Sequence, residues 1–389
     1  MTDIHPIARL PEEWAAQMPK LGGRAFNATQ VFRWIHARGV TDPMAMTDQS
    51  AAMRARLVED GMGPVAEVAS VRRATDHTRK ALIRLAGDFN VETVLIPGVG
   101  GPKPWEHEMD ADAAAADDDG EDDDDFGPQA GTAPRTRVSQ CISTQVGCAM
   151  GCVFCASGVA GLKRHMTAAE IVSQVLLGRA LLDDTEKLRN VVYMGMGEPL
   201  HNYEAVARSL KLLTHKEGIA LPARRITVST SGLVPEIKRL GADFGGQIGL
   251  AISLHASDDE TRSRMMPINK KYPIAELLKA LKEYPLPPRR RITIEYTLVS
   301  GRNDDAMEAK KLARVLKGLK VKINLIPMNP IEASTLGPPD DRRVQGFKQI
   351  LADAGYDVFV RRRRGDDVDA ACGQLALLGA KPKVRVNRD

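Results

Sequence analysis

Three cysteines within eight residues are the first feature of this sequence that could perform chemistry. Cys148, Cys152 and Cys155 have the spacing C-x3-C-x2-C and follow a segment that is expected to be a strand. Thiolates are soft ligands that suit iron–sulfur clusters, and three of them leave one iron of a [4Fe–4S] cluster free to chelate a substrate. Buried structural cysteines and a zinc site are the alternatives. Structural zinc normally has four protein ligands, and no fourth Cys or His has suitable local spacing, so the pattern favours a cluster.

A glycine-rich motif, Gly195-Met-Gly-Glu-Pro199, follows a second expected strand. Glycines let the backbone approach a ligand closely, and the carboxylate of Glu198 could accept hydrogen bonds from an ammonium group. Taken alone, this run could also be a turn that only ends the strand.

Three further residues have reactive side chains but no motif of their own. Cys141 and Cys372 are isolated cysteines, and an isolated cysteine usually packs as a small buried hydrophobic residue. Glu92 lies in an expected strand, where the sequence pattern alone would place it on the solvent face. None of the three is assigned a function by its surroundings in the sequence.

Strands that alternate with helices must position these residues. Six apolar segments alternate with helical segments, which argues for a parallel sheet, and six strands are too few for a closed eight-stranded barrel. We therefore predict an α/β fold, a partial (β/α)6 barrel in which functional residues lie at the C-terminal ends of the strands. The predicted strands are Val138–Thr144, Asn190–Met194, Ile226–Ser229, Ile248–Leu254, Ile292–Leu298 and Val321–Ile326.

The rest of the chain divides by composition. We expect a small N-terminal helical domain over residues 1–60, a β extension over 61–98 that contains a hairpin, the barrel over 138–375 and a C-terminal tail over 376–389. Residues 99–137 have Gly, Pro and Ala but almost no apolar periodicity, so we expect a disordered acidic insertion.

The charge distribution indicates a polyanionic partner. The chain of 389 residues has a net charge of +4, but residues 106–125 contain twelve acids and no Lys or Arg, so the remainder carries +16. A basic surface of this size suits nucleic acid, although it could also be an ordinary solvated surface. The sequence has no signal peptide and no apolar run of membrane-spanning length, which predicts a cytoplasmic protein that does not bind a membrane.

Taken together, the motifs resemble the radical S-adenosylmethionine (SAM) superfamily, and within it the RlmN family of dual-specificity RNA methyltransferases. The resemblance covers about residues 24–98 and 138–380, and the acidic insertion is the main departure. It rests on CISTQVGC (141–148), the three cluster cysteines, GMGEPLHN (195–202), STSG (229–232), ISLHA (252–256), PMNP (327–330) and RGDDVDAACGQL (364–375).

The resemblance implies a role for each matching position. Cys148, Cys152 and Cys155 would bind the cluster. Cys372 would carry a methyl group, Cys141 would resolve the product, and Glu92 would accept a proton. The residues expected to contact SAM are Gly197, Glu198, Ser229, Ser253, Leu254, His255 and Asn329.

The implied activity is formation of 2-methyladenosine in 23S rRNA, at an adenine of the peptidyl-transferase centre, and in tRNA, at the adenine 3′ of the anticodon. It would proceed through a methylated cysteine and a transient protein–RNA adduct, with two SAM molecules per turnover, a reductant such as flavodoxin and a monomeric enzyme. Two alternatives stay open: a Cfr-like enzyme that methylates carbon 8 of adenine, and a non-catalytic iron–sulfur module that binds RNA.

Overall fold

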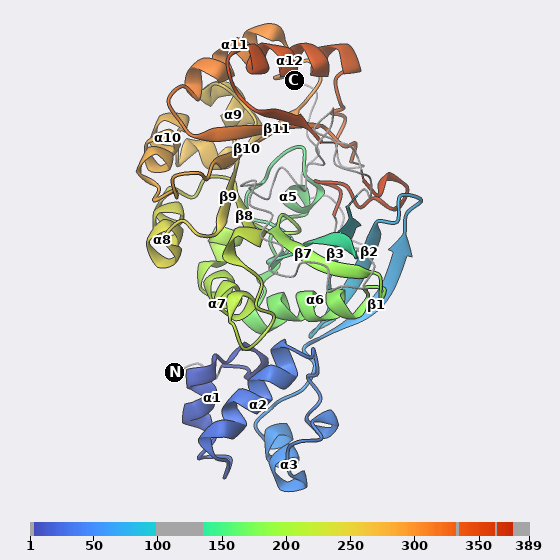
Figure 1. The fold of residues 1–389 in the computed structure, drawn as a ribbon. Coiled ribbons are helices and arrows are strands. Elements are labelled where there is room, and N and C mark those ends of the chain that lie inside the picture. Colours follow the sequence, from blue (N-terminus) through green and yellow to red (C-terminus); the bar gives the residue numbers. More distant parts are fainter. Residues whose placement is uncertain (1–3, 99–134, 332–333, 362–363, 376–389) are drawn as a thin grey trace.

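A single curved sheet organises most of the molecule (Figure 1). The computed structural model describes residues 4–98, 135–331, 334–361 and 364–375. Within these residues the sheet has ten strands in the order β1-β2-β3-β4-β7-β8-β9-β10-β11-β12. Because β1 and β12 are its two edges, the sheet stays open.

The parallel part of the sheet confirms the predicted partial barrel and adds one strand. Neighbouring strands are parallel from β4 to β12, with each of the six predicted strands in its expected place. The additional strand, β12, has only three residues and is half-buried, so it gave no clear apolar pattern. These strands are β4 (Thr136–Cys141), β7 (Glu186–Tyr193), β8 (Ile226–Thr230), β9 (Gly249–Ser253), β10 (Ile292–Leu298), β11 (Val321–Pro327) and β12 (Val358–Val360).

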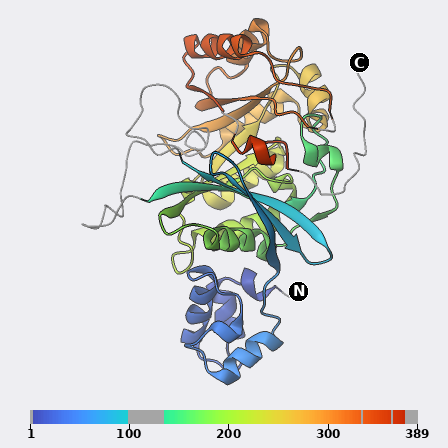
Figure 2. The ribbon, with the colours of Figure 1, turned by 90° about the vertical axis from the view of Figure 1, so that its right-hand side faces the viewer.

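Helices cover one face of the parallel strands, and the main hydrophobic core lies between the two layers (Figures 1 and 2). A capping box begins α6. In it, the side chains of Thr167 and Glu170 each accept a hydrogen bond from the other residue's backbone N–H. The helices along this layer are α6 (Ala168–Ala180), α7 (Tyr203–Thr214), α8 (Val234–Phe244), α9 (Asp259–Met265), α10 (Ile274–Glu283), α11 (Ala306–Val315) and α12 (Asp341–Asp353).

The N-terminal residues form a separate group of helices, α1 (Pro11–Gln17), α2 (Ala25–His36) and α3 (Ala51–Glu59). Their hydrophobic core also includes residues of α6, which attaches this group to the barrel. The helix α2 begins at Ala25, and the Asn27 side chain accepts a hydrogen bond from the backbone N–H of Arg24.

The predicted β extension is an antiparallel addition to the barrel sheet. It consists of β1 (Ala66–Arg73), β2 (Arg79–Leu85) and β3 (Phe89–Pro97), and β3 pairs with β4. The hairpin expected between β2 and β3 is present, with Gly87 and Asp88 at positive φ in its turn.

Two expected segments fall mainly or wholly outside the described residues. These are the acidic insertion, of which only residues 135–137 are described, and the tail over 376–389. Thr136 and Arg137 already belong to β4, so the strand begins two residues before the predicted Val138. In the described part of the chain, no helix has the length and apolar character needed to cross a membrane.

Candidate active site

The expected site residues gather at one edge of the sheet, where the parallel strands end. The cysteine loop follows β4, the Gly195–Pro199 motif follows β7, and His255 and Asn329 follow β9 and β11. Because the C-terminal ends of parallel strands share an edge, residues that are far apart in the sequence meet here.

The three clustered cysteines lie between a short strand, β5 (Gln145–Val146), and a short helix, α5 (Ala156–Ala160). The loop is fixed to the barrel because the Val153 N–H donates to the carbonyl oxygen of Met265 at 3.1 Å. Gly158 of α5 packs against it so closely that an added Cβ would lie 2.9 Å from the backbone nitrogen of Cys152. The backbone that carries the three cysteines is therefore held in place by tight packing.

The chemistry of these thiols fits a metal cluster. Burial raises the pKa of Cys148 to about 12 and that of Cys152 well above its usual value, and burial also raises the pKa of Cys155. The thiols also raise one another's pKa, so the site needs a bound cation to hold thiolates. Among the described residues, no three Cys, His, Asp or Glu side chains converge on a point suited to a single ion. Three cluster ligands bind three different irons, so they need not converge on one ion as the ligands of a zinc site do.

The Gly195–Pro199 motif is a tightly packed loop in which two glycine positions leave no space for a Cβ atom. An added Cβ on Gly195 would lie 2.7 Å from the Ile142 backbone, and Gly197 has φ +106° and faces the Gln145 side chain. The Glu198 carboxylate accepts hydrogen bonds from the backbone N–H groups of Ser231, at 2.7 Å, and Leu200, at 3.1 Å. Burial raises the pKa of Glu198, and hydrogen bonds from the backbone of Ser231 and Leu200 and from the side chains of Thr230 and Ser231 oppose that effect. A carboxylate accepts hydrogen bonds and can pair with an ammonium group.

The ends of β8 and β9 are held together by one buried arginine. The Arg262 guanidinium donates to the carbonyl oxygens of Ser231, Ser253 and Leu254 at 2.7 to 3.2 Å. Burial lowers its pKa to about 10, which leaves it cationic at neutral pH. Arg262 thereby fixes the backbone beside Ser229, Ser253 and Leu254.

His255 extends this edge toward the cysteine loop. Its ring lies edge-on to that of Phe154, with the ring centres 4.8 Å apart. Burial lowers the pKa of His255 to about 3, so the ring is neutral. Since Nδ1 accepts a hydrogen bond from the Thr297 N–H at 2.9 Å, the ring proton is on Nε2, which can donate to a ligand.

The segment that carries Cys372 crosses this edge and bonds to the cysteine loop. Asn329 Nδ2 donates to the carbonyl oxygen of Cys372 at 2.9 Å, and the Ala156 N–H donates to that of Gly373 at 2.8 Å. The Ser157 hydroxyl donates to the carbonyl oxygen of Leu375 at 2.6 Å. A residue near the end of the described chain is thus brought beside the cysteine loop.

Glu92 and Cys141 lie on the adjacent strands β3 and β4, and both are buried. The solvent-facing position that the strand pattern gives Glu92 is wrong, since the residue is only 6% exposed. Its carboxylate lies 3.1 Å from Lys80 Nζ, and its carbonyl oxygen accepts a hydrogen bond from the Ser143 hydroxyl. Neither Cys141 nor Cys372 is in a disulfide in this structure.

Sequence reasoning missed three residues that hold this site. Lys80 pairs with Glu92, Arg262 ties two strand ends, and Gln145 accepts a hydrogen bond from the Glu198 N–H at 2.8 Å. Lys80 and Arg262 each lie in an otherwise ordinary element, so only their burial in the fold reveals them. Gln145 lies within the CISTQVGC motif, which could have drawn attention to it.

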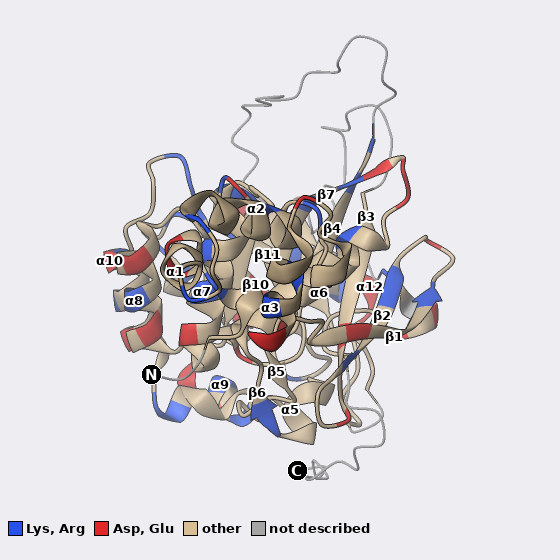
Figure 3. Cartoon of the chain, turned by 90° about the horizontal axis from the view of Figure 1, so that it is seen from below, with Lys and Arg blue, Asp and Glu red and all other residues tan. Residues whose placement is uncertain are grey.

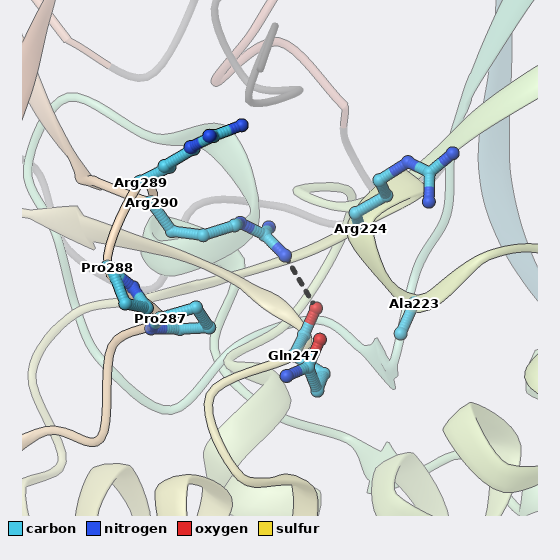
Figure 4. Close-up of a pocket in the computed structure, with 7 residues that line it drawn as sticks. All are labelled: Ala223, Arg224, Gln247, Pro287, Pro288, Arg289 and Arg290. Atoms are coloured by element: carbon cyan, nitrogen blue, oxygen red, sulfur yellow. Dashed lines mark hydrogen bonds between the residues drawn. The ribbon is translucent and has the colours of Figure 1, made fainter. Parts of the chain in front are cut away.

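Several groups of arginines lie away from these strand ends. Arg224 and Arg225 precede β8, and Arg289 and Arg290 precede β10, so they lie at the opposite edge of the sheet. There, a cavity of about 430 Å³ is lined by arginines and prolines, and Arg290 is fixed by a 2.9 Å hydrogen bond to the carbonyl oxygen of Gln247 (Figure 4). Elsewhere, Lys and Arg are interspersed with acids on β1, β2 and the helices (Figure 3).

Comparison with known proteins identifies the family. Residues 142–313 match the Radical SAM superfamily, and residues 12–61 match the ribosomal RNA large subunit methyltransferase N-terminal domain. The dual-specificity RNA methyltransferase RlmN of Sorangium cellulosum is 68% identical over 99% of this chain and 98% of its own length. The same-named protein of Marinomonas sp. is 44% identical over 96% of this chain and 94% of its own.

The fold gives the same result. A radical SAM methyltransferase from Sphaerobacter thermophilus superposes with a TM-score of 0.81 at 38% identity, over 96% of this chain and 99% of that one. The chain is therefore a methyltransferase of the radical SAM superfamily and belongs to the RlmN family.

Proposed function

We propose that this enzyme forms 2-methyladenosine in 23S rRNA and in tRNA, with Cys372 as the carrier of the methyl group. As a radical SAM protein it uses SAM and a [4Fe–4S] cluster. The observation that carries the proposal is the pair of backbone contacts that join the Cys372 segment to Asn329 and Ala156. They bring the backbone of Cys372 and Gly373 beside the cysteine loop, which supports transfer of a methyl group at Cys372 next to the cluster.

Cys148, Cys152 and Cys155 are the proposed cluster ligands. Together with SAM, the cluster held by these residues would supply radical chemistry that can take a hydrogen atom from an unactivated methyl group. The loop around Phe154 is fixed by α5 and α9, so the ligands are positioned before the cluster binds.

The strand ends form the proposed SAM site. Glu198 suits the ammonium group of SAM, because a carboxylate accepts hydrogen bonds from a cationic donor and its backbone neighbours hold it in place. His255 Nε2 is a donor in a dry environment. The other proposed SAM contacts are Ser229, Ser253, Leu254 and Asn329, whose Oδ1 is buried without a protein partner.

The remaining steps belong to three side chains. The Cys372 thiolate would attack the SAM methyl carbon, release S-adenosylhomocysteine and become a thioether. After one hydrogen atom is removed from that carbon, it would bond to carbon 2 of adenine and leave one unpaired electron on the adduct. The Glu92 carboxylate then accepts the proton from carbon 2. Cys141 would then attack the sulfur of Cys372 and break its bond to the methylene carbon. That carbon would take a proton and leave as the methyl group of the RNA, the unpaired electron would return to the cluster that supplied it, and a reductant would reopen the disulfide.

Other parts of the proposal concern conditions and partners. We propose two SAM molecules per turnover, a flavodoxin-like electron donor, a monomeric enzyme and a cytoplasmic location.

The target adenine must leave its base stack to reach the buried site. Lys270 and Lys271, which follow α9, and Arg361 and Arg364 lie at or near the edge of the sheet that bears the site and would contact RNA phosphates.

Mass spectrometry of RNA nucleosides tests this function. A strain that lacks the protein should lose 2-methyladenosine from 23S rRNA and tRNA, and a plasmid copy should restore it. Loss of 8-methyladenosine instead would mean a Cfr-like enzyme. If no methyladenosine changes and the purified protein makes no 5′-deoxyadenosine from SAM, the chain is a non-catalytic RNA-binding module.

A further inference from the structure

Lys80 connects two parts of the proposed site that come from opposite ends of the chain. Its ammonium nitrogen lies 3.1 Å from Glu92 Oε1 and donates a hydrogen bond to the carbonyl oxygen of Asp369 at 3.2 Å. Asp369 precedes Cys372 by three residues. One side chain therefore touches both the proposed proton acceptor and the segment that carries the proposed methyl group.

The pair is positioned by strand register. Lys80 on β2 is the register partner of Val94, and Leu82 is that of Glu92, so Lys80 and Glu92 are diagonal neighbours on one face of the hairpin. Their side chains are only 10% and 8% exposed. A buried carboxylate needs a cation or several hydrogen-bond donors beside it, and Lys80 is such a cation.

The second contact of Lys80 is made with a segment of constrained shape. Asp369 has φ +51°, which is unusual for a residue with a Cβ, and the neighbouring Gly365 has φ +62°. The turn before β2 holds the same segment, because Asp76 Oδ2 accepts a hydrogen bond from the Gly365 N–H and the Thr75 N–H donates to Asp367 Oδ2. The β1–β2 hairpin thus holds the segment that precedes Cys372, and Lys80 makes one of these contacts.

We propose that Lys80 is a positioning residue that holds the Glu92 carboxylate in place for the adduct formed on Cys372. This inference rests on the proposed function and adds a residue to it. The ammonium group does not touch the reacting atoms. It acts by compensating the charge of Glu92 and by tying the position of Glu92 to that of the Cys372 segment.

Lys80→Met is the direct test, because methionine keeps most of the length and loses the charge. With SAM, a chemical reductant and a 23S rRNA fragment, formation of 2-methyladenosine should fall by about tenfold or more, as expected when a general base is lost. Iron content and SAM-dependent methylation of Cys372 should stay close to wild type, because the segment keeps its contacts with Asn329, Ala156 and Asp76. Lys80→Arg, which retains a cation, should recover part of the product.

A double variant separates positioning from general damage. If Lys80 acts through Glu92, Lys80→Met combined with Glu92→Gln should be no slower than Glu92→Gln alone. Arg84→Met is the matched control, since Arg84 makes an ion pair with Glu67 on the same hairpin but is exposed. This control should turn over at the wild-type rate.

Each outcome decides the inference. If wild-type protein makes no 2-methyladenosine, the proposed function itself fails. If wild type and Lys80→Met are equally active, Lys80 is not a positioning residue for Glu92. The same conclusion follows if Lys80→Met loses methylation of Cys372 to the same extent as it loses product. Should Lys80→Met not fold, Lys80→Gln, which keeps a donor for Asp369 but no charge, takes its place under the same criteria.

Discussion

Asn329 Nδ2 donates a hydrogen bond to the carbonyl oxygen of Cys372 at 2.9 Å, across 43 positions of the sequence. Asn329 follows β11, so the bond attaches the Cys372 segment to a strand end of the barrel. On its other side the segment bonds to the cysteine loop through Ala156 and to the turn before β2 through Asp76. The position of Cys372 therefore depends on three elements that the fold brings together.

Gly365→Ala should disturb this arrangement. Gly365 has φ +62°, and an added Cβ would lie 2.7 Å from the Ala370 Cβ and 2.9 Å from the Thr78 Cγ2. The backbone must shift, so we expect methylation of Cys372 by SAM to fall severalfold, with a cost in stability of about 1 to 3 kcal/mol. Mass spectrometry of the Cys372 peptide after incubation with SAM measures the effect.

Gly355→Ala is the matched control for that substitution. Gly355 also has a positive φ, +89°, but an added Cβ would meet nothing within 4 Å, and it lies beyond α12. It should lose similar backbone stability and keep full methylation of Cys372. Equal methylation in both variants would show that the packing at Gly365 does not position Cys372.

Cys152→Ala should remove the cluster. The anaerobically reconstituted wild-type protein should contain about four irons per chain, and the variant should contain almost none, because two thiolates do not retain a [4Fe–4S] cluster. Iron analysis and the visible absorption spectrum provide the measurement. Cys141→Ala, which alters a cysteine outside the cluster loop, should keep all its iron. A full cluster in Cys152→Ala would exclude Cys152 as a ligand.

The sequence predicted those parts of the site that depend on local pattern. Strand ends after β4, β7 and β9 follow from apolar segments and turn residues, so the cysteine loop, Glu198 and His255 could be placed at one edge before the structure was known. The capping box at Thr167 is a local pattern of the same kind, since both of its residues lie within four positions.

What the sequence could not predict depends on contacts between distant segments. Glu92 is buried because β2 pairs beside it and the segment before Cys372 passes nearby, and neither neighbour is visible in the alternation of one strand. Arg262 occupies a helix position that would ordinarily be polar and exposed, yet it is fully buried beneath two strand ends. Three residues of β12 are too few to form a recognisable apolar period.

A histidine of the N-terminal helices should make the protein sensitive to mild acid. Burial lowers the pKa of His36 to about 3, from 6.5 in an exposed histidine. Between these values the unfolded chain binds a proton that the folded chain does not, so stability falls as pH decreases from about 6.5 toward 3. His36→Phe should reduce the slope of unfolding free energy against pH by up to about 1.4 kcal/mol per pH unit in that range.

Urea unfolding at pH 7, 6 and 5 checks this prediction. His77→Asn is the control, because His77 is exposed in the turn before β2 at a positive φ that asparagine tolerates. The control should follow the wild-type curve. If His36→Phe shows the wild-type slope as well, His36 does not contribute to the acid sensitivity.

Deletion of residues 102–134 should leave the enzyme folded and active. The flanking strands β3 and β4 are paired, and the Gly98 N–H donates to the carbonyl oxygen of Arg137 at 2.7 Å, so a short turn can replace the insertion. Removing twelve acids should also tighten RNA binding at low salt and have less effect at high salt. Filter binding at two salt concentrations, together with a turnover assay, measures both effects. Loss of folding or turnover would contradict the prediction.

The last prediction separates the two isolated cysteines. If Cys372 carries the methyl group, the product stays joined to the protein until a second thiol breaks the thioether, and Cys141 is the remaining cysteine once three bind the cluster. Cys372→Ala should therefore take up no methyl from SAM and make no product. Cys141→Ala should accept the methyl, add it to RNA and then stall as a covalent adduct, which a denaturing gel detects after incubation with SAM, reductant and RNA. The thiols need a Cα separation of no more than about 7 Å at the moment of exchange, so movement of the Cys372 segment is part of the expected cycle. A Cys141→Ala protein that runs free of RNA and turns over normally would make Cys141 a packing residue and require another route for product release.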